Sequence, residues 1–123
     1  MKFQMLAICL LLAGCAAQSN ISVQQPVTND SSVKEFRIIA QMFSFNPGTI
    51  EVNQGDKVRL IVKSVDVPHG FAIKEYNIKE YLAPQEEVVI EFVADKAGTF
   101  RFYCSVPCGK DHKAMNGTLV VTA

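Results

Sequence analysis

Short segments in which apolar and polar side chains alternate make up most of the chain, and this pattern restricts the fold more than any other feature. Val58, Leu60 and Val62 would lie on one face of a strand, with mostly charged side chains on the other face. Residues 87–93 show the same two-residue period. No segment sustains the 3.6-residue apolar period of an amphipathic helix. The pattern therefore predicts an all-β protein.

Turn-forming residues separate the expected strands, most clearly at Asn46-Pro47-Gly48 and at Asp95-Lys96-Ala97-Gly98. We read residues 76–83 as irregular, ending at Pro84. The expected strands are 35–41, 49–52, 57–65, 69–73, 87–93, 99–104 and 117–121. Seven or eight short strands at this spacing are typical of a Greek-key β-barrel or β-sandwich.

The N-terminal residues have the pattern of an export signal. Lys2 precedes a short apolar run over 5–13, which is too short for a membrane-spanning helix of about 20 residues. Leu12-Ala13-Gly14-Cys15 resembles the bacterial lipobox, in which cleavage precedes the cysteine and its thiol is acylated. We therefore expect a signal peptide over 1–14 and a lipid on Cys15, and the alternative is an ordinary signal peptide in which Cys15 is incidental.

Composition then divides the rest of the chain. Residues 15–33 are rich in Gln, Ser, Asn and Thr without a strand or helix period, which predicts a flexible tether before a domain over 34–123. The protein would be exported and held at the membrane by its N-terminal lipid. Twelve Lys and Arg against twelve Asp and Glu give no bulk basic character, so we expect no nucleic-acid partner.

One loop near the C-terminus gathers residues that bind metals. Cys104, Cys108, His112 and Met115 lie between two expected strands. Thioether sulfur favours copper among the common metals, whereas two cysteines and a histidine alone would suggest zinc. His69, which follows a proline at a strand start, is the candidate donor from outside the loop. The alternatives are a disulfide between the two cysteines of an exported protein, a buried histidine and a core methionine.

Two motifs together resemble the periplasmic copper domain of cytochrome c oxidase subunit II. The first is Asp66-Val67-Pro68-His69, and the second is Cys104-x3-Cys108-Gly109-x2-His112-x2-Met115. The resemblance extends over residues 36–123. It implies a cupredoxin fold that holds a dinuclear copper centre of the CuA type, with two coppers per chain.

The resemblance also implies a role for each donor. The donors are His69, Cys104, Val106 through its backbone carbonyl, Cys108, His112 and Met115. The two thiolates would bridge both coppers. His69 and Met115 would complete one copper, and His112 and the Val106 carbonyl would complete the other. Bridging thiolates let both coppers share one unpaired electron, which favours fast one-electron transfer.

Several residues depart from the oxidase pattern. Val106 stands where the family commonly has a glutamate that helps hold magnesium, and residues 41–45 lack the tryptophans of the family's electron-accepting segment. Lys110 and Lys113 flank His112, where an acidic surface for a basic cytochrome c would be expected. A lipid anchor would replace the family's transmembrane hairpin. These departures favour a separate electron carrier over a conventional oxidase subunit.

The sequence thus supports a lipid-anchored copper protein that exchanges electrons with a redox partner such as a cytochrome or an oxidase complex. No second site for substrate chemistry is visible, so we expect no small-molecule substrate and no enzyme activity of the chain alone. At most it would be the electron-accepting subunit of an oxidase-type complex. The alternatives are a copper storage or delivery module, and a mononuclear blue-copper site that leaves one cysteine unexplained.

Overall fold

The computed structural model describes Gly14 and residues 33–123. Apart from Gly14 and Val33, the predicted signal peptide and tether, with Cys15, lie outside the described residues. Within the described part of the chain, no helix is long and apolar enough to cross a membrane.

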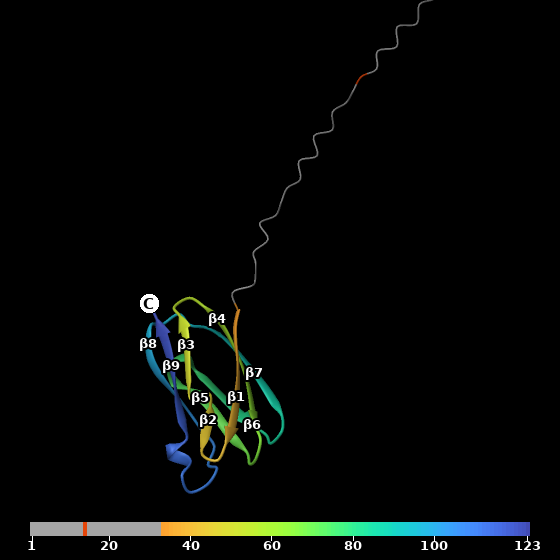
Figure 1. Cartoon of the computed structure of the whole chain (residues 1–123), viewed down its shortest axis with the longest axis vertical. Coiled ribbons are helices and arrows are strands. Elements are labelled where there is room, and N and C mark those ends of the chain that lie inside the picture. Colours follow the sequence, from red (N-terminus) through yellow and green to blue (C-terminus); the bar gives the residue numbers. More distant parts are fainter. Residues whose placement is uncertain (1–13, 15–32) are drawn as a thin grey trace, which may run out of the picture.

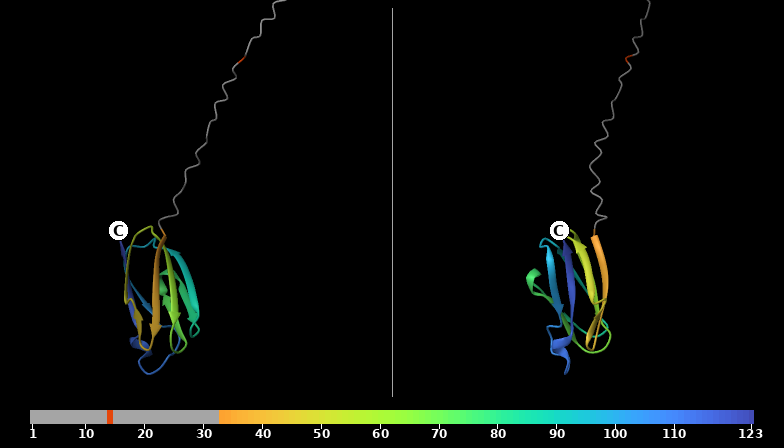
Figure 2. Two further views of the ribbon diagram at one scale, coloured as in Figure 1. Left: turned by 45° about the vertical axis from the view of Figure 1, so that its right-hand side comes forward. Right: turned by 60° about the vertical axis from the view of Figure 1, so that its left-hand side comes forward.

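The described residues form two packed β-sheets, and Figures 1 and 2 show them as two layers. The strands are β1 (Val33–Gln41), β2 (Ser44–Asn46), β3 (Thr49–Asn53), β4 (Lys57–Ser64), β5 (His69–Ile73), β6 (Ile78–Leu82), β7 (Glu87–Val93), β8 (Gly98–Tyr103) and β9 (Asn116–Thr122). One sheet has the order β2-β1-β4-β7 and the other β3-β9-β8-β5-β6. Both are mixed, because β1 pairs with β4 and β3 with β9 in parallel. The predicted all-β sandwich is confirmed, with nine strands among the described residues.

Two of these strands were not predicted. β2 has only three residues, and it forms because it pairs with the end of β1 and buries Phe45. Residues 76–83, which we expected to be irregular, contain the whole of β6. Its period is weak because this edge strand buries only Leu82 fully. Pairing with β5 along all five residues of β6 outweighs its poor alternation.

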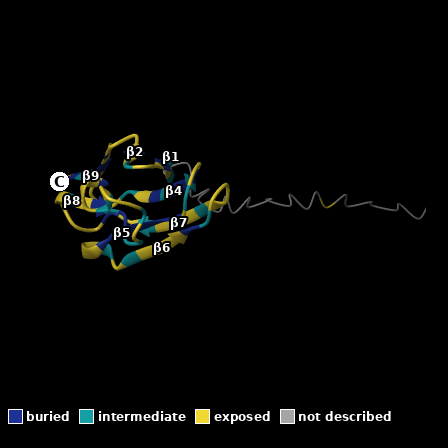
Figure 3. Cartoon of the chain, turned by 90° about the horizontal axis from the view of Figure 1, so that it is seen from below, coloured by how far each residue is buried: buried dark blue, intermediate teal, exposed yellow. Residues whose placement is uncertain are grey.

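The core lies between the sheets, where Figure 3 shows the buried parts of the strands. Phe71 stacks on Phe102 with ring centroids 5.2 Å apart. Phe45 meets both rings edge-on, at 5.6 and 5.4 Å. Cys104 and Met115 belong to the same buried cluster. The two ends of the predicted metal loop are therefore fixed by the core.

That loop lies at the opposite end of the sandwich from the start of β1 and the end of β9 (Figure 1). It includes a short 3-10 helix, η2 (His112–Ala114). A second one, η1 (Lys74–Tyr76), follows β5.

Candidate metal centre

Two neighbouring strands bring the ends of the metal loop together. Cys104 follows β8 and Met115 precedes β9, and the two strands pair antiparallel up to Tyr103 and Asn116. The Cys104 N–H donates a hydrogen bond to the Met115 carbonyl at 3.1 Å. Gly109 has φ +145°, a conformation that glycine adopts without strain. The loop therefore folds back so that its donors can converge.

His69 joins this loop from the first position of β5, the strand beside β8. Its ring is fully buried, and Nδ1 lies 3.8 Å from the Cys104 Sγ. The other ring nitrogen, Nε2, lies 2.7 Å from Oδ1 of Asp66. A carboxylate on one ring nitrogen sets the tautomer and leaves the other nitrogen free to bind a metal. The geometry thus presents Nδ1 of His69 to the loop.

Hydrogen bonds from the backbone fix the position of the Asp66 carboxylate, which in turn orients His69. The backbone N–H groups of Met42 and Val67 donate to its carboxylate at 2.7 and 2.6 Å. Burial alone would raise the pKa of Asp66, but hydrogen bonds from Met42, Val67 and His69 outweigh burial and lower this pKa. Asp66 is therefore a charged support for His69.

The sulfur atoms of the loop form a compact group. Sγ of Cys104 and Sγ of Cys108 are 3.7 Å apart, and both thiols are free. Because a disulfide requires about 2.05 Å between its sulfurs, these two are separate donors. Cys108 Sγ lies 3.6 Å from His112 Nδ1 and 3.9 Å from Met115 Sδ. Cys104 Sγ lies 3.1 Å from the Val106 carbonyl oxygen.

All six donors predicted from the sequence therefore gather at one end of the sandwich. His69, Cys104 and Cys108 present ligand atoms that lie within 4.8 Å of one another. His69 and Met115 are fully buried, while Cys108 and His112 are partly buried, so the centre has one side near solvent. Two thiols, two imidazoles, a thioether and a carbonyl suit a soft or borderline transition metal such as copper.

The Cys108 thiol is protonated in the metal-free protein at neutral pH. Burial is the main cause that raises the pKa of Cys108 to about 11, and the neighbouring thiol of Cys104 raises it further. A metal that binds Cys108 must displace this proton, since thiolate is the ligand form of cysteine. Metal uptake is therefore coupled to proton release.

Gly70 supports the site in a way that the sequence analysis missed. A Cβ on Gly70 would lie 2.8 Å from the Ser105 nitrogen and 2.9 Å from the Val106 nitrogen, so the loop packs directly on the β5 backbone. The Gly70 N–H also points to the Cys104 Sγ, at 3.4 Å. An isolated glycine inside an expected strand was the available signal, because it often marks close backbone approach.

A second contact that the sequence analysis missed lies across the far side of the loop. A Cβ on Gly109 would lie 2.8 Å from the Phe43 ring, which places the β1–β2 turn against the loop. The adjacent Met42 N–H reaches Asp66, as described above. This turn therefore contacts both the loop and the support of His69.

Two known proteins are similar in sequence to most of this chain. A stretch of 91 residues is 36% identical to nitrous-oxide reductase of Cupriavidus necator, covering 71% of this chain and 14% of that protein. Another of 84 residues is 34% identical to cytochrome c oxidase subunit 2 of Thermus thermophilus, covering 68% of this chain and 62% of that protein. The chain thus spans less than two thirds of either relative.

A solved structure is similar in fold as well. The periplasmic domain of subunit II of cytochrome oxidase of Bradyrhizobium japonicum superposes with a TM-score of 0.66 at 22% identity, covering 72% of this chain and 83% of that domain. Residues 3–121 match the family model described as a cupredoxin-like domain. With its two-sheet sandwich and its sulfur-rich loop, the chain belongs to the cupredoxin-like domain family.

Proposed function

We propose that this protein is an electron carrier that binds two copper ions per chain in a dinuclear centre of the CuA type. One observation carries the proposal. The two thiols lie 3.7 Å apart, and a different imidazole flanks each of them, His69 at Cys104 and His112 at Cys108. A mononuclear site would need only one of these thiols. Paired thiols with separate imidazoles suit two metal ions that share both sulfurs.

The remaining donors divide between the same two positions. The Val106 carbonyl lies beside Cys104, and the Met115 thioether lies beside Cys108. Copper supplies reversible one-electron chemistry when bound by such donors. The protein residues hold the donors in place, since the core fixes both loop ends and Asp66 orients His69. A rigid donor set keeps structural change on electron transfer small.

Copper loading tests the proposal directly. We expect two coppers per chain and one electron spin shared between two copper nuclei in electron paramagnetic resonance. Cys104→Ser should abolish the dinuclear centre. Met115→Leu should leave it assembled with a shifted potential, because the volume of this buried side chain is conserved. One copper per chain with a single-nucleus spectrum would refute the proposal.

Storage or delivery of copper is the competing function. A delivery protein needs ligands that exchange readily, yet His69, Cys104 and Met115 are at most 3% exposed. Burial of half the donor set supports retention over release. We therefore expect the loaded protein to keep its copper when mixed with a metal-free acceptor protein. Rapid transfer of copper would favour delivery.

We further propose that the protein is exported and anchored through a lipid on Cys15. The support is the sequence pattern over residues 1–15, together with the relation to a periplasmic domain. Mass spectrometry of the protein from membranes should find acylated Cys15 as the first residue. A different N-terminus without lipid would refute the anchor and leave the copper proposal unaffected.

A further inference from the structure

A recess of about 440 Å³ opens beside the metal centre. Its lining includes Lys79, Arg101, Tyr103, Cys104, His112 and Lys113. Two of these residues are proposed metal donors, and three others are the basic residues Lys79, Arg101 and Lys113. Whatever occupies this recess therefore lies next to the metal centre in a positively charged environment.

The register of three strands builds this recess on the outer face of the five-stranded sheet. Lys79 on β6 is opposite Ala72 on β5, and Ala72 is opposite Tyr103 on β8. Only a methyl side chain thus stands between Lys79 and Tyr103 in this row. Arg101 comes two residues before Tyr103 and shares its face of the sheet. Lys113 is added from the metal loop, by η2.

The cations of the recess are positioned without being neutralised. The Arg101 guanidinium donates to the Lys113 carbonyl at 3.3 Å and lies 5.4 Å from the centre of the Tyr103 ring. Among the described residues, no carboxylate forms an ion pair with Lys79, Arg101 or Lys113. Their charge is therefore available to a ligand.

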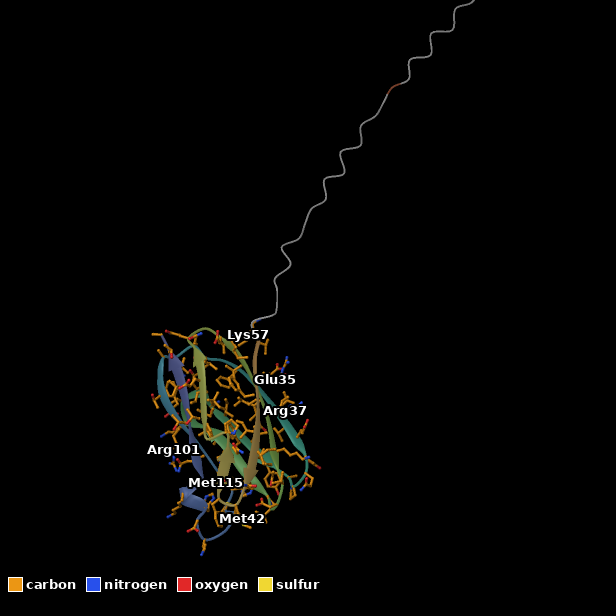
Figure 4. The ribbon with its side chains drawn as sticks, in the orientation of Figure 1. Glu35, Arg37, Met42, Lys57, Arg101 and Met115 are labelled. Carbon is orange, nitrogen blue, oxygen red and sulfur yellow. The ribbon has the colours of Figure 1, made fainter. Side chains whose placement is uncertain are left out.

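On the outer face of the four-stranded sheet, unlike in the recess, the arginines form ion pairs with carboxylates. Arg37 pairs with Glu87 at 3.0 Å. Arg59 pairs with Glu91 at 2.8 Å and with Glu35 at 3.3 Å. Figure 4 shows Arg101 on one side of the sandwich, and Glu35 and Arg37 on the other. Since the whole chain has a formal charge of zero, the free positive charge of the recess is a local feature.

The surface beyond the recess favours a protein as its occupant. Tyr81 lies two residues after Lys79 on β6, and 57% of it is exposed. Tyrosine and arginine are enriched in protein interfaces, and complementary charge guides such encounters. A small anion would use the cations alone, whereas a protein face can cover the tyrosine as well.

We infer that the recess formed by Lys79, Arg101 and Lys113 is the docking site for a redox protein with an acidic surface. The inference rests on the electron-transfer function proposed above. The partner's carboxylates would contact the three cations and bring its redox group close to His112 and Cys104. A reduced partner then loses one electron, which the metal centre gains. The basic recess excludes partners whose docking surface is itself basic.

Stopped-flow kinetics test this inference. The oxidised, copper-loaded protein is mixed at low salt with a reduced acidic c-type cytochrome and, separately, with a reduced basic cytochrome c. In K79Q/K113Q we expect the rate constant for the acidic cytochrome to fall about tenfold or more, and its salt dependence to weaken. The matched control is K34Q/K63Q, with the same charge change on strands β1 and β4 of the four-stranded sheet, and its rate should stay close to that of the parent. An unchanged rate in K79Q/K113Q, or an equal loss in both variants, would overturn the inference.

A second measurement needs no copper, so it separates failure of docking from failure of the copper proposal. The metal-free protein, labelled with ¹⁵N, is titrated with the acidic cytochrome and with inorganic phosphate. We expect the cytochrome to shift the amide signals of Lys79, Arg101 and Lys113, and K79Q/K113Q to lose these shifts. If phosphate gives the same shifts and the cytochrome gives none, the recess is a small-anion site and the docking inference is wrong.

Discussion

Substitution of Gly70 by alanine should release copper while the sandwich stays folded. The new Cβ would lie 2.8 Å from the Ser105 nitrogen and 2.9 Å from the Val106 nitrogen. Both atoms belong to the backbone, so no side-chain rotation relieves the overlap. Because non-bonded contacts are favourable at about 3.5–4.0 Å, the loop must withdraw by about 0.6 Å or more.

That displacement is small for the fold but large for a metal site. Overpacking of this kind costs about 1–3 kcal/mol of stability. Metal–ligand distances tolerate only about 0.2 Å, and the displaced loop includes Val106 and follows Cys104 directly. Loss of comparable support around a metal lowers its affinity about 10- to 100-fold. We therefore expect Gly70→Ala to lose its copper to a chelator at concentrations that leave the parent loaded.

Chelator competition measures the copper affinity, and urea unfolding of the metal-free protein measures the stability. Gly48→Ala is the matched control, because a Cβ there would meet only the Phe45 carbonyl oxygen at an ordinary 3.6 Å. It should retain copper as the parent does. If Gly70→Ala also keeps parental copper affinity, the close packing of the loop on β5 does not position the donors, and the reasoning fails.

Three further predictions concern the core, the support of His69 and alkaline stability. Phe102→Ala removes a fully buried ring that contacts two other rings. We expect urea unfolding to show that the free energy of unfolding falls by about 3–5 kcal/mol. A fall below about 1 kcal/mol would contradict this packing. Asp66→Ala removes the hydrogen bond to His69, so copper affinity in chelator competition should fall about 10- to 100-fold, and no change would show that Asp66 does not orient the ring. Burial raises the pKa of Tyr76, so the neutral phenol stabilises the fold below the unfolded pKa of about 10 and this contribution disappears as pH rises through the folded value. Tyr76→Phe should therefore lose less stability than the parent between neutral and strongly alkaline pH, and identical pH profiles would argue against this origin.

Much of the fold was predictable because its signals are local. The alternation in β4 and β7 reflects one more buried and one more exposed face of a strand, and the structure confirms that both segments are strands. β2 and β6 escaped prediction because neither has a clear period of its own. Each forms through pairing with an adjacent strand, and pairing is a property of the folded chain.

The proposed chemistry of the site follows from the residue types in the sequence alone. Four of its side-chain donors lie within one loop, and donor softness is a property of residue type, so Cys104, Cys108, His112 and Met115 indicate copper before any fold is known. His69 was a candidate on the sequence. Only the sandwich brings its ring nitrogen to within 3.8 Å of a sulfur 35 residues away.

The tertiary structure alone decided how the loop is supported and what its surroundings offer. The loop backbone packs on Gly70, and Asp66 holds one ring nitrogen of His69 so that the other faces the loop. Both features follow from contacts between separate strands and turns. The charge of the recess likewise depends on strand register, which groups Lys79 with Arg101. No carboxylate in the described part of the chain forms an ion pair with either. Residue type determines which metal the chain can bind, whereas the distance between chain-remote residues determines how it is held and what can approach it.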